Sequence, residues 1–358
     1  METRDSATTA ESTPRELGYW MPAEWAKHEA IWLSWPHDPT TFTSGVDKVE
    51  ETYIQIIKLI HKEEDVNLFV RDQDMQGKIS RLFRGEDIGF SKIRFFQFDY
   101  ADVWFRDYGP IFLLNGKGEL AMVHWKFNCW GEKYEELLKD AEIPSVINSK
   151  LHLKCFEPGI VLEGGSIDVN GEGTVLTTRQ CLLNENRNPE FGKEKIERYL
   201  QDYLGVRHVI WLGSGIAGDD TDGHIDDLAR FVSPTTVVCA YEEDASDENG
   251  EALERNYEIL CQSSDQDGKK LKVVKLPTPG KIEYGGKRLP ASYTNFYIGN
   301  NTVLVPTFGS ENDEKALAIM QQQFPERRVV GIDCTDLVCG FGAIHCISQQ
   351  QPATIKLQ

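Results

Sequence analysis

Apolar residues along the chain follow two spacings, and their order predicts which segments are helices and which are strands. Between 46 and 62 they recur every three or four residues, the spacing of an amphipathic helix: Val46, Val49, Tyr53, Ile56, Ile57 and Ile60. Around Asn115 and Gly116, short apolar runs at 111–114 and 120–125 flank a turn, and an Asn-Gly pair is a strong hairpin signal. The chain is therefore predicted to be of mixed α/β class.

One order of elements recurs along the chain: a hairpin, a helix and a closing strand. Hairpins are predicted at 111–125, 166–178, 228–241 and 296–306. Helices are predicted at 46–62, 74–83, 132–140, 190–204, 249–263 and 311–323. Further strands are predicted at 30–35, 66–70, 93–98, 209–212, 271–276 and 328–332. About five units of roughly 50–70 residues result, and repetition on that scale indicates a radial or linear array.

Residues suited to acid–base or nucleophilic chemistry occupy the same place in successive units, at the start of a hairpin. They are Asp107, Glu163, His224, Asp226 and Cys346. If the units ring a common axis, these side chains converge at its centre. No linker rich in Pro, Gly or Ser divides the units, so a single domain is expected over 17–358. The polar segment 1–16 is expected to be a disordered N-terminal tail.

The composition argues against several classes of partner. The chain of 358 residues has a formal net charge of −19 and no basic stripe, which argues against nucleic acid and is compatible with a cationic substrate. It has no apolar run of the roughly 18 residues that a membrane span needs. The N-terminus lacks the apolar core of a signal peptide, so the cytoplasm is the expected compartment.

Neither the cysteines nor the aspartates have the spacing of a known metal site. The eight cysteines form no C-x-x-C pair, so reduced thiols are expected rather than a disulfide framework. Cys334, Cys339 and Cys346 lack the spacing of zinc knuckles. The segment 218–227 contains five aspartates but not the glycine and glutamate positions of an EF-hand loop. No metal is therefore expected.

Cys346 stands in an unusual setting for a core cysteine. It follows the glycine-broken turn 340–342 and is predicted to enter a short strand at 344–347, which would present its thiol to a cavity. Because side chains alternate along a strand, the neighbouring His345 is expected to face the opposite side and to be structural. A cysteine thiolate is a strong nucleophile and a competent leaving group, and His224 can both donate and accept a proton.

Four motifs carry the acidic, histidine and cysteine positions in order along the chain. They are Asp102-x-Trp104-x-Arg106-Asp107-x-Gly109-Pro110, Leu162-Glu163-Gly164-Gly165-Ser166-Ile167, Gly218-Asp219-Asp220-Thr221-Asp222-Gly223-His224-Ile225-Asp226 and Ile344-His345-Cys346-Ile347-x-Gln349-Gln350. Together they resemble the agmatine deiminase (agmatine iminohydrolase) family, which belongs to the guanidine-modifying enzymes with the pentein fold. Weaker matches at 21–25, 184–189 and 291–297 extend the resemblance over about 17–352.

The resemblance implies a fold and an activity. The implied fold is a five-bladed α/β propeller with pseudo-fivefold symmetry, which agrees with the repeated units. The implied reaction is hydrolysis of agmatine to N-carbamoylputrescine and ammonia, a step of putrescine and polyamine biosynthesis, without metal or organic cofactor. The expected partner is this small cationic substrate, and the resemblance also implies that the chain can form a homodimer.

Matched motif by motif, the resemblance also implies roles for individual residues. Cys346 matches the nucleophile, His224 the general acid and base, and Glu163 the carboxylate that partners the histidine. Asp107 and Asp226 match the pair that binds the guanidinium group. Two carboxylates suit that ligand because they can accept its fork of N–H donors bidentately.

Other residues are candidates to contact the rest of the substrate. Asp220 matches a position that contacts agmatine in the family, and Asp220 or Asp222 is a candidate partner of the distal ammonium. Trp35 and Trp104 are candidates to flank the methylene chain. Phe341 departs from the family pattern, because this bulky residue stands where plant relatives carry glycine.

Competing functions differ in the residues they require. An arginine or peptidyl-arginine deiminase of the same fold would need a donor for a carboxylate or amide, which Arg106 could supply. An amidinotransferase would share the covalent intermediate and differ in what attacks it. A papain-like hydrolase would place its cysteine before its histidine, the reverse of the order here. A non-enzymatic guanidine- or polyamine-binding protein would need the carboxylates but not Cys346.

Overall fold

The sheets of the protein repeat one pattern, an antiparallel pair extended by a parallel strand. The computed structural model describes residues 12–354, which contain five such sheets and a separate hairpin. Two sheets have four strands each. The strand order of one is β19 (Gln349–Pro352), β2 (His28–Ser34), β3 (Asp65–Val70), β4 (Ile93–Gln97). The strand order of the other is β1 (Tyr19–Trp20), β5 (Ile111–Asn115), β6 (Leu120–Val123), β7 (Lys154–Phe156). Three sheets have three strands, ordered β10 (His208–Leu212), β9 (Thr174–Thr178), β8 (Asp168–Val169); β11 (Ala229–Ser233), β12 (Thr236–Tyr241), β13 (Lys272–Pro277); and β16 (Tyr297–Ile298), β17 (Thr302–Thr307), β18 (Arg328–Asp333). The hairpin consists of β14 (Glu283–Tyr284) and β15 (Lys287–Arg288).

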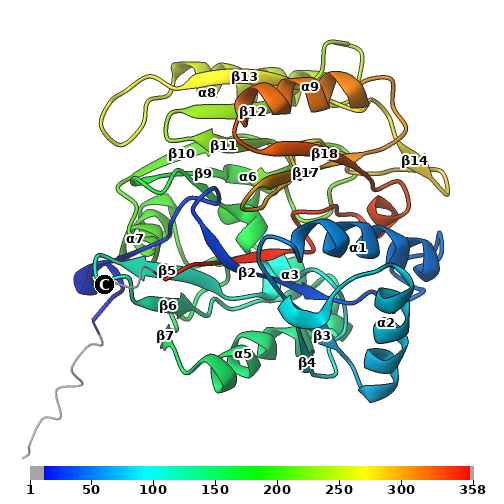
Figure 1. The fold of residues 1–358 in the computed structure, drawn as a ribbon. Coiled ribbons are helices and arrows are strands. Elements are labelled where there is room, and N and C mark those ends of the chain that lie inside the picture. Colours follow the sequence, from blue (N-terminus) through cyan, green and yellow to red (C-terminus); the bar gives the residue numbers. More distant parts are fainter. Residues whose placement is uncertain (1–11, 355–358) are drawn as a thin grey trace, which may run out of the picture.

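Helical segments connect the strands of each sheet, and the longer helices lie toward the outside of the molecule (Figure 1). The longer helices are α1 (Val46–Ile60), α2 (Gln73–Gly85), α5 (Ile143–Leu151), α7 (Lys193–Leu204), α8 (Gly250–Gln262) and α9 (Asp313–Gln323). The short segments are α3 (Phe105–Tyr108), α4 (Cys129–Glu132), α6 (Arg179–Leu182), and the 3₁₀ helices η1 (Arg15–Leu17), η2 (Phe90–Lys92), η3 (Glu135–Glu142), η4 (Gly164–Ser166), η5 (Ile225–Asp227) and η6 (Leu337–Gly340). The outer helices are amphipathic; α1, for example, buries Val49, Tyr53, Ile56, Ile57 and Ile60.

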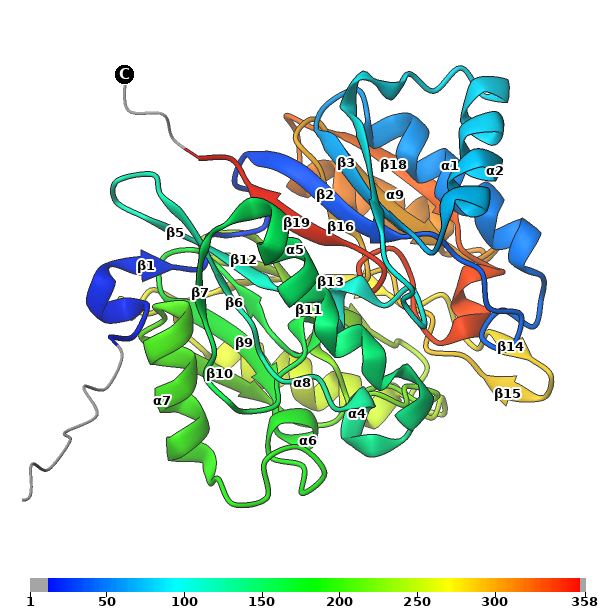
Figure 2. The same cartoon turned by 90° about the horizontal axis from the view of Figure 1, so that it is seen from below.

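The C-terminal strand β19 belongs to the same sheet as β2, which lies near the N-terminus. β19 pairs antiparallel with β2, so that Gln349 lies opposite Trp32 and Gln350 opposite Ile31. Figure 2 shows β19 beside β2, although the two strands come from opposite ends of the chain. The five sheets agree with the roughly five repeated units that the sequence predicted and with the five-bladed α/β propeller that the resemblance implied.

Most predicted elements are confirmed, and two are wrong. β9 and β12 begin and end where predicted, and α1 begins at Val46. The predicted helix 132–140 is instead largely the 3₁₀ helix η3, which leads into α5. The predicted strand 344–347 is a turn, because the backbone N–H groups of His345 and Cys346 bond to the side chain of Asn295 rather than to a neighbouring strand.

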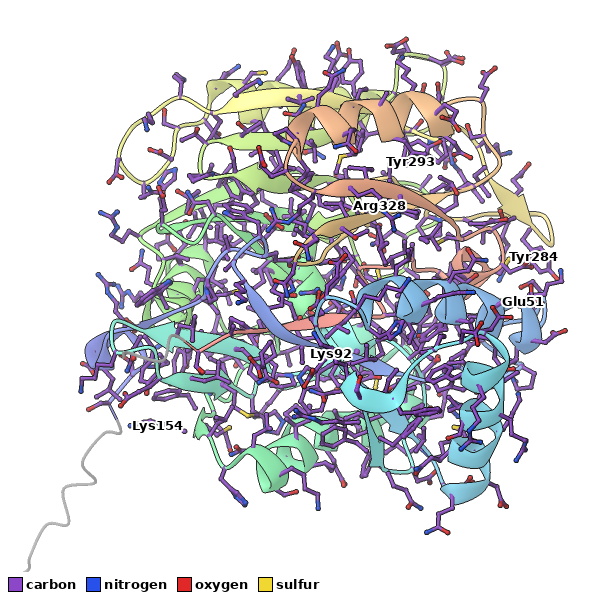
Figure 3. All side chains as sticks on the ribbon, viewed as in Figure 1. Glu51, Lys92, Lys154, Tyr284, Tyr293 and Arg328 are labelled. Atoms are coloured by element: carbon purple, nitrogen blue, oxygen red, sulfur yellow. The ribbon has the colours of Figure 1, made fainter. Side chains whose placement is uncertain are left out.

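Side chains fill the space between the sheets and the outer helices (Figure 3). Aromatic rings gather around Trp32, which stacks on Phe105 and Phe112. Tyr284, on the outer hairpin, is 43% exposed. Within residues 12–354, no helix is both long and apolar enough to cross a membrane.

The N-terminal segment begins its regular structure before the predicted boundary at residue 17. Residues 1–11 of the predicted tail lie outside the described residues. Of the remainder, Arg15 begins the 3₁₀ helix η1, and Tyr19 in β1 pairs with Asn115 of β5. The sheet of β1, β5, β6 and β7 therefore holds the start of the described chain.

Candidate active site

The predicted site residues lie at the start of four sheets and come together in space. Asp107 belongs to α3, Glu163 precedes η4, His224 precedes η5, Asp226 lies within η5, and Cys346 lies in the turn before β19. All five are buried, with exposures of 0 to 7%. The prediction that these five positions converge is confirmed by the contacts that follow.

Gly165 allows three of these side chains to meet. A Cβ atom added there would lie 2.6 Å from Nδ1 of His224, 2.8 Å from Oδ1 of Asp107 and 3.2 Å from Oδ2 of Asp226. The backbone N–H of Gly165 also donates to Oδ1 of Asp107 at 3.0 Å. A side chain at this position would therefore push the reactive groups apart.

A cavity of about 320 Å³ opens beside these residues, and both Asp107 and Cys346 line it. Much of the remaining lining is aromatic or acidic: Trp104, Trp130, Tyr134, Phe341, Asp38, Asp102, Glu136 and Asp220. Within the described part of the chain, no Lys or Arg lines this cavity. Carboxylates attract a cation and aromatic rings cover an apolar chain, so the cavity suits a ligand with both features.

Cys346 is held by contacts to its backbone and to its sulfur. Its carbonyl accepts a hydrogen bond from the backbone N–H of Arg106 at 3.0 Å, and its Sγ accepts from Nδ2 of Asn295 at 3.0 Å. Sγ also lies 3.6 Å from Oδ2 of Asp226. Burial, followed by the charges of Asp226 and Asp227, raises the pKa of the Cys346 thiol well above its usual value. The free protein therefore holds a thiol that a bound cation would help to ionise.

Asp226 and Asp107 are fixed by different donors. Oδ2 of Asp226 accepts from Nδ1 of His345 at 2.7 Å, and its Oδ1 has no hydrogen-bond partner within the described residues. Burial alone would raise the pKa of Asp226, but the hydrogen bond and charge of His345 outweigh it and lower that pKa. Burial raises the pKa of Asp107 to about 6. Asp226 therefore offers a charged carboxylate with one free oxygen.

A strained segment brings Trp130 to Asp107. Four consecutive residues of α4, from Cys129 to Glu132, have left-handed φ values of 55°, 55°, 88° and 64°. Each non-glycine residue in that conformation costs about 1–2 kcal/mol, and such strain gathers at functional sites. Nε1 of Trp130 donates to Oδ2 of Asp107 at 2.9 Å, while Asn128 caps the segment by accepting from Gly131. The unusual turn thus positions a donor for the carboxylate.

The His224 imidazole lies among acidic groups. Its Nδ1 is 3.7 Å from Oδ1 of Asp107, and neither ring nitrogen has a hydrogen-bond partner within the described residues. Burial would lower the pKa of His224, but Asp107, then Cys181 and Glu163, raise it well above the usual value. Asp219 fixes the backbone here by accepting from the N–H groups of Gly223 and His224 at 2.7 and 3.2 Å.

Glu163 is bound to arginine rather than directly to the histidine. Its Oε1 accepts from Nε of Arg187 at 2.6 Å, and its Oε2 has no hydrogen-bond partner within residues 12–354. Ligand-type atoms of Glu163, Cys181 and His224 lie within 4.8 Å of one another. Glu163 is therefore near enough to act on His224 through its charge, without a hydrogen bond between them.

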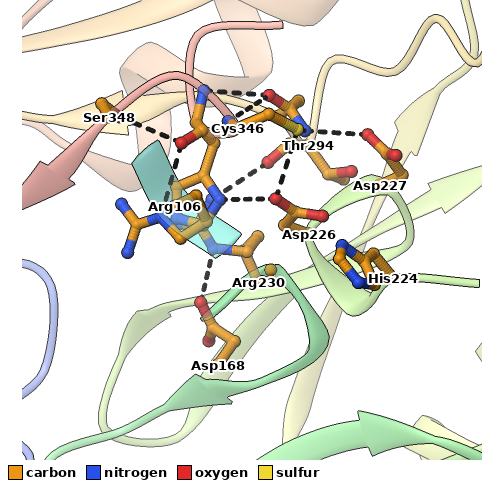
Figure 4. A network of polar contacts seen from close by, with 12 residues as sticks. Arg106, Asp168, His224, Asp226, Asp227, Arg230, Thr294, Cys346 and Ser348 are labelled. Atoms are coloured by element: carbon orange, nitrogen blue, oxygen red, sulfur yellow. Dashed lines mark hydrogen bonds and ion pairs between the residues drawn. The ribbon is translucent and has the colours of Figure 1, made fainter. Parts of the chain in front are cut away.

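A buried network of charged side chains lies next to Asp226 and includes Arg106, Arg230 and Asp168 (Figure 4). Oε1 of Glu24 lies 3.2 Å from Nη1 of Arg106 and 3.0 Å from Nε2 of His345, and Arg230 pairs with both Glu24 and Asp168. Burial would raise the pKa of Glu24, but Arg106, Arg230 and His345 hold it well below its usual range. The network fixes His345, which in turn fixes Asp226.

Comparisons with known proteins agree with this geometry. The sequence profile of the family described as Porphyromonas-type peptidyl-arginine deiminase matches residues 20–352. The agmatine deiminases of Pseudomonas syringae pv. tomato and Ectopseudomonas mendocina are 38% and 37% identical to the chain, over 98% and 97% of it and 100% and 99% of those proteins. The solved structure of the Enterococcus faecalis agmatine deiminase matches with a TM-score of 0.89 at 37% identity, over 96% of this chain and 98% of that chain. The chain belongs to the agmatine deiminase family. The pentein fold implied by the motifs is thereby confirmed.

Of the two tryptophans predicted to flank the substrate, the structure supports one. In this member of the agmatine deiminase family, Trp104 lines the cavity and Trp35 does not. Trp35 is fully buried in the core, where its Nε1 donates to Glu50 at 2.8 Å and its ring packs on Tyr53. The prediction for Trp35 is wrong because Trp35, directly after β2, packs its side chain against Glu50 and Tyr53 of α1.

The position expected for His345 is also wrong. The alternation of side chains along a strand does not apply, since residues 344–347 form a turn. The side chain of His345 is fully buried and contacts Asp226, one of the two carboxylates assigned to guanidinium binding. It is a positioning residue of the site rather than a residue facing away from it.

Two aspartates of the acidic segment 218–227 have different partners. Asp220 lines the cavity and accepts from the hydroxyl of Tyr134. Asp222 pairs with Arg187 at 2.8 Å and with Lys133 at 2.9 Å, so its charge is already balanced. Of the two candidates for the distal ammonium, Asp220 is the one that lines the cavity.

Phe341 has a backbone conformation that favours glycine, the residue that the sequence comparison with plant relatives would place there. Its φ is 72°, in the left-handed region, and its side chain lines the cavity. The following Gly342 is tightly packed, since an added Cβ would clash with the ring of Trp104 and lie 3.0 Å from Cβ of Cys346. The nucleophile turn therefore packs directly on Trp104.

Sequence reasoning missed Trp130, Tyr134 and Asn295 as parts of the site. Asn295 falls within the weaker motif 291–297, which could have marked it as a site residue. Nothing in that segment indicated a contact with Cys346. Trp130 lies outside every motif, and its approach to Asp107 depends on the left-handed turn. These residues meet the site only through the packing of the blades.

Proposed function

We propose that this protein is an agmatine deiminase, which hydrolyses agmatine to N-carbamoylputrescine and ammonia through a covalent intermediate on Cys346. The observation that carries the proposal is a thiol that touches one carboxylate and shares with another the lining of a cavity that no described Lys or Arg lines. Asp107 and Cys346 line that cavity, and Asp226 lies 3.6 Å from the sulfur. Relatives named agmatine deiminases, 37 to 38% identical over nearly the whole chain, support the same substrate.

The guanidinium group binds between Asp107 and Asp226 in this proposal. The unpartnered Oδ1 of Asp226 is a buried acceptor that requires a donor, and a guanidinium N–H supplies one. Binding of the cation lowers the raised pKa of Asp107, because the opposite charge favours the carboxylate form. The two carboxylates hold the central carbon of the substrate close to Sγ of Cys346.

The bound cation also activates the nucleophile. The pKa of Cys346 is raised by burial and by neighbouring carboxylates, and an adjacent guanidinium opposes both effects. The amide of Asn295 donates to the sulfur and further favours the thiolate. The thiolate then attacks the central carbon and forms a tetrahedral adduct, with the new C–S bond made at the expense of one C=N π bond.

His224 transfers protons in both halves of the reaction. Its raised pKa keeps it protonated, so it can donate a proton to the departing nitrogen, which leaves as ammonia and generates the cationic amidino-thioether. The neutral imidazole then takes a proton from water as the water oxygen attacks the same carbon. Collapse of this second adduct breaks the C–S bond, forms the C=O bond of the product and restores the thiolate, while the remaining hydroxyl proton passes to solvent. We assign to Glu163 the stabilisation of the imidazolium by its charge.

The cavity favours agmatine over arginine. The α-carboxylate of arginine would need a cationic or N–H partner, and Arg106 is fully buried against Glu24, away from the cavity lining. Asp220, Asp102 and Glu136 instead offer carboxylates suited to a distal ammonium. Trp104 and Trp130 are placed to cover the methylene chain between the two charged ends.

Three further expectations belong to the same proposal. We infer that the five blades act as one catalytic domain over 17–358, that the protein works in the cytoplasm, and that it forms a homodimer. All eight cysteines are free thiols, which supports a reducing compartment. Fractionation of the source cells tests the compartment, and sedimentation of the full chain tests the dimer.

Ammonia release tests the reaction directly. Wild-type protein and the Cys346→Ser variant are assayed with agmatine, arginine and a peptidyl arginine side by side. Turnover of agmatine by the wild type alone is expected. Preferential turnover of arginine would contradict the assignment of the acidic lining, and full activity of Cys346→Ser would exclude this nucleophile.

A guanidine-binding protein without catalysis is the second candidate, because the carboxylates alone would serve it. Such a protein would bind agmatine and release no ammonia. Iodoacetamide labelling separates the two functions further. A reactive thiol at Cys346 that agmatine protects supports the enzyme, whereas a thiol of ordinary reactivity favours simple binding.

A further inference from the structure

Three side chains of types that bind metals gather at the proposed catalytic centre, and two of them, Glu163 and His224, also take part in the mechanism above. Glu163, Cys181 and His224 each offer one ligand atom, and the three atoms lie within 4.8 Å of one another. All three residues are buried, with exposures of 0, 0 and 1%. Carboxylate oxygen, thiolate sulfur and imidazole nitrogen bind Zn²⁺ at about 2.0–2.3 Å, so a small inward movement would place all three on one ion.

Two members of this cluster have unused polar atoms. Both ring nitrogens of His224 and Oε2 of Glu163 are buried and have no hydrogen-bond partner among the described residues. Buried polar groups in folded proteins are nearly always bonded to protein or to water. Three buried nitrogen and oxygen atoms of the cluster are therefore free to bind a ligand.

The surrounding charges favour a divalent cation. Oδ1 of Asp107 lies 3.7 Å from Nδ1 of His224, and the Arg187 guanidinium lies 2.6 Å from Oε1 of Glu163. With Cys181 ionised on binding, three negative charges face one positive charge, which leaves two negative charges for the ion to balance. A thiolate and an imidazole select Zn²⁺ over Mg²⁺ or Ca²⁺, which prefer oxygen ligands.

The cluster lies next to the substrate cavity, and Asp107 is their shared neighbour. Asp107 lines the cavity and also faces His224, so one carboxylate connects the two sites. Cys346 is not a member of the cluster, which separates this site from the nucleophile.

We propose that Glu163, Cys181 and His224 form an inhibitory binding site for Zn²⁺. Binding exchanges the ion for the proton of the Cys181 thiol and for the proton held by the His224 imidazolium, and both protons pass to solvent. No other covalent bond changes and no group is oxidised or reduced. A metal-bound His224 cannot form the imidazolium that donates a proton to departing ammonia, so the occupied protein is inactive. That consequence rests on the proposed function, whereas metal binding does not.

Zinc binding is measured first, in the full chain without substrate, by competition with a chromophoric chelator. We expect one equivalent of Zn²⁺ bound by the wild type and by Cys346→Ser. Affinity is expected to fall roughly 100-fold in Cys181→Ser and Cys181→Ala, since loss of a partner that merely supports a metal ligand already costs about 10–100-fold. Undiminished affinity in the two Cys181 variants would overturn the proposal, and so would a loss confined to Cys346→Ser.

Cobalt supplies a test that does not depend on the folding of the Cys181 variants. Co²⁺ in place of Zn²⁺ gives a thiolate-to-metal charge-transfer absorption when a cysteine is a ligand. The band is expected in both the wild type and Cys346→Ser at one equivalent, and its absence from Cys346→Ser would exclude Cys181 as the ligand.

Turnover is then followed at increasing zinc occupancy and after addition of chelator. Each variant is compared with its own zinc-free rate. Inhibition that follows occupancy and is reversed by the chelator is expected. Normal turnover at full occupancy would refute the inhibitory role. Absence of agmatine turnover at every zinc level would refute the proposed function alone, because the binding and cobalt results stand independently.

Discussion

Nδ2 of Asn295 donates a hydrogen bond to Sγ of Cys346 at 3.0 Å. The other end of the same amide, Oδ1, accepts from the backbone N–H groups of His345 and Cys346 at 2.9 and 3.2 Å. One fully buried side chain thus holds both the backbone and the sulfur of the proposed nucleophile. A donor directed at the sulfur favours the thiolate, which burial disfavours.

Replacement of Asn295 by alanine is expected to lower kcat/KM by roughly 10–100-fold, because a hydrogen bond to a charged group contributes about 1.5–3 kcal/mol. The pKa of the Cys346 thiol should rise as well, and the pH dependence of iodoacetamide alkylation measures that change. Asn301→Ala is the matched control, since Asn301 is exposed. An unchanged alkylation profile in Asn295→Ala would show that the amide only maintains the fold.

The pH dependence of kcat/KM should show an acid limb centred near pH 6. Asp107 has a pKa raised to about 6 and must be ionised to bind a guanidinium, so activity falls as the pH drops through that value. In the substrate complex the cation lowers this pKa, so the acid limb of kcat should lie at lower pH. Steady-state rates with agmatine across the pH range test both limbs. A kcat/KM limb near the ordinary aspartate value would contradict the assignment.

Trp130→Phe is expected to move that acid limb to higher pH. The indole N–H donates to Oδ2 of Asp107 and holds its pKa down, so loss of the donor raises the pKa. We expect kcat/KM to fall about tenfold at neutral pH, in line with the net contribution of one hydrogen bond to a charged group. The comparison of the two pH profiles is decisive, because a purely structural effect of the substitution lowers the rate without shifting the limb.

Gly165→Ala should leave the protein folded and nearly inactive. The added methyl group would lie 2.6 Å from Nδ1 of His224 and 2.8 Å from Oδ1 of Asp107, so both must move. A displacement of about 1 Å among reacting groups can cost roughly 100-fold in rate. Gly89→Ala is the control, because nothing lies within 4 Å of its added Cβ. Equal kcat/KM for the two variants, with circular dichroism as a check on folding, would refute the crowding argument.

Asp220→Asn and Asp222→Asn are expected to have different effects. Asp220 faces the cavity, so loss of its charge should raise the KM for agmatine about tenfold, equivalent to about 1.4 kcal/mol, with kcat little changed. Asp222 pairs with Arg187 and Lys133, so its loss should mainly lower thermal stability, by about 1 kcal/mol. Agmatine kinetics and thermal unfolding of both variants test this division. Equal increases in KM would contradict it.

Local sequence determined the elements and the places where chemistry occurs. Hairpin turns, apolar spacing and glycine motifs act over a few residues, so the helix from Val46 and the strand Thr174–Thr178 could be predicted directly. The recurrence of Asp107, His224, Asp226 and Cys346 at the start of successive hairpins also predicted their meeting, because equivalent positions in a ring of repeats face one centre.

Tertiary structure decided which neighbours each of these residues has. Trp35 and Trp104 are both aromatic residues near predicted strands, yet only Trp104 reaches the cavity. Asn295 is 51 residues from Cys346 in sequence, and Arg187 is 24 residues from Glu163, so neither contact follows from a local pattern. Spacing along a strand or helix determines which face a side chain occupies. The partner on that face is determined by how the blades pack, and packing depends on the whole chain.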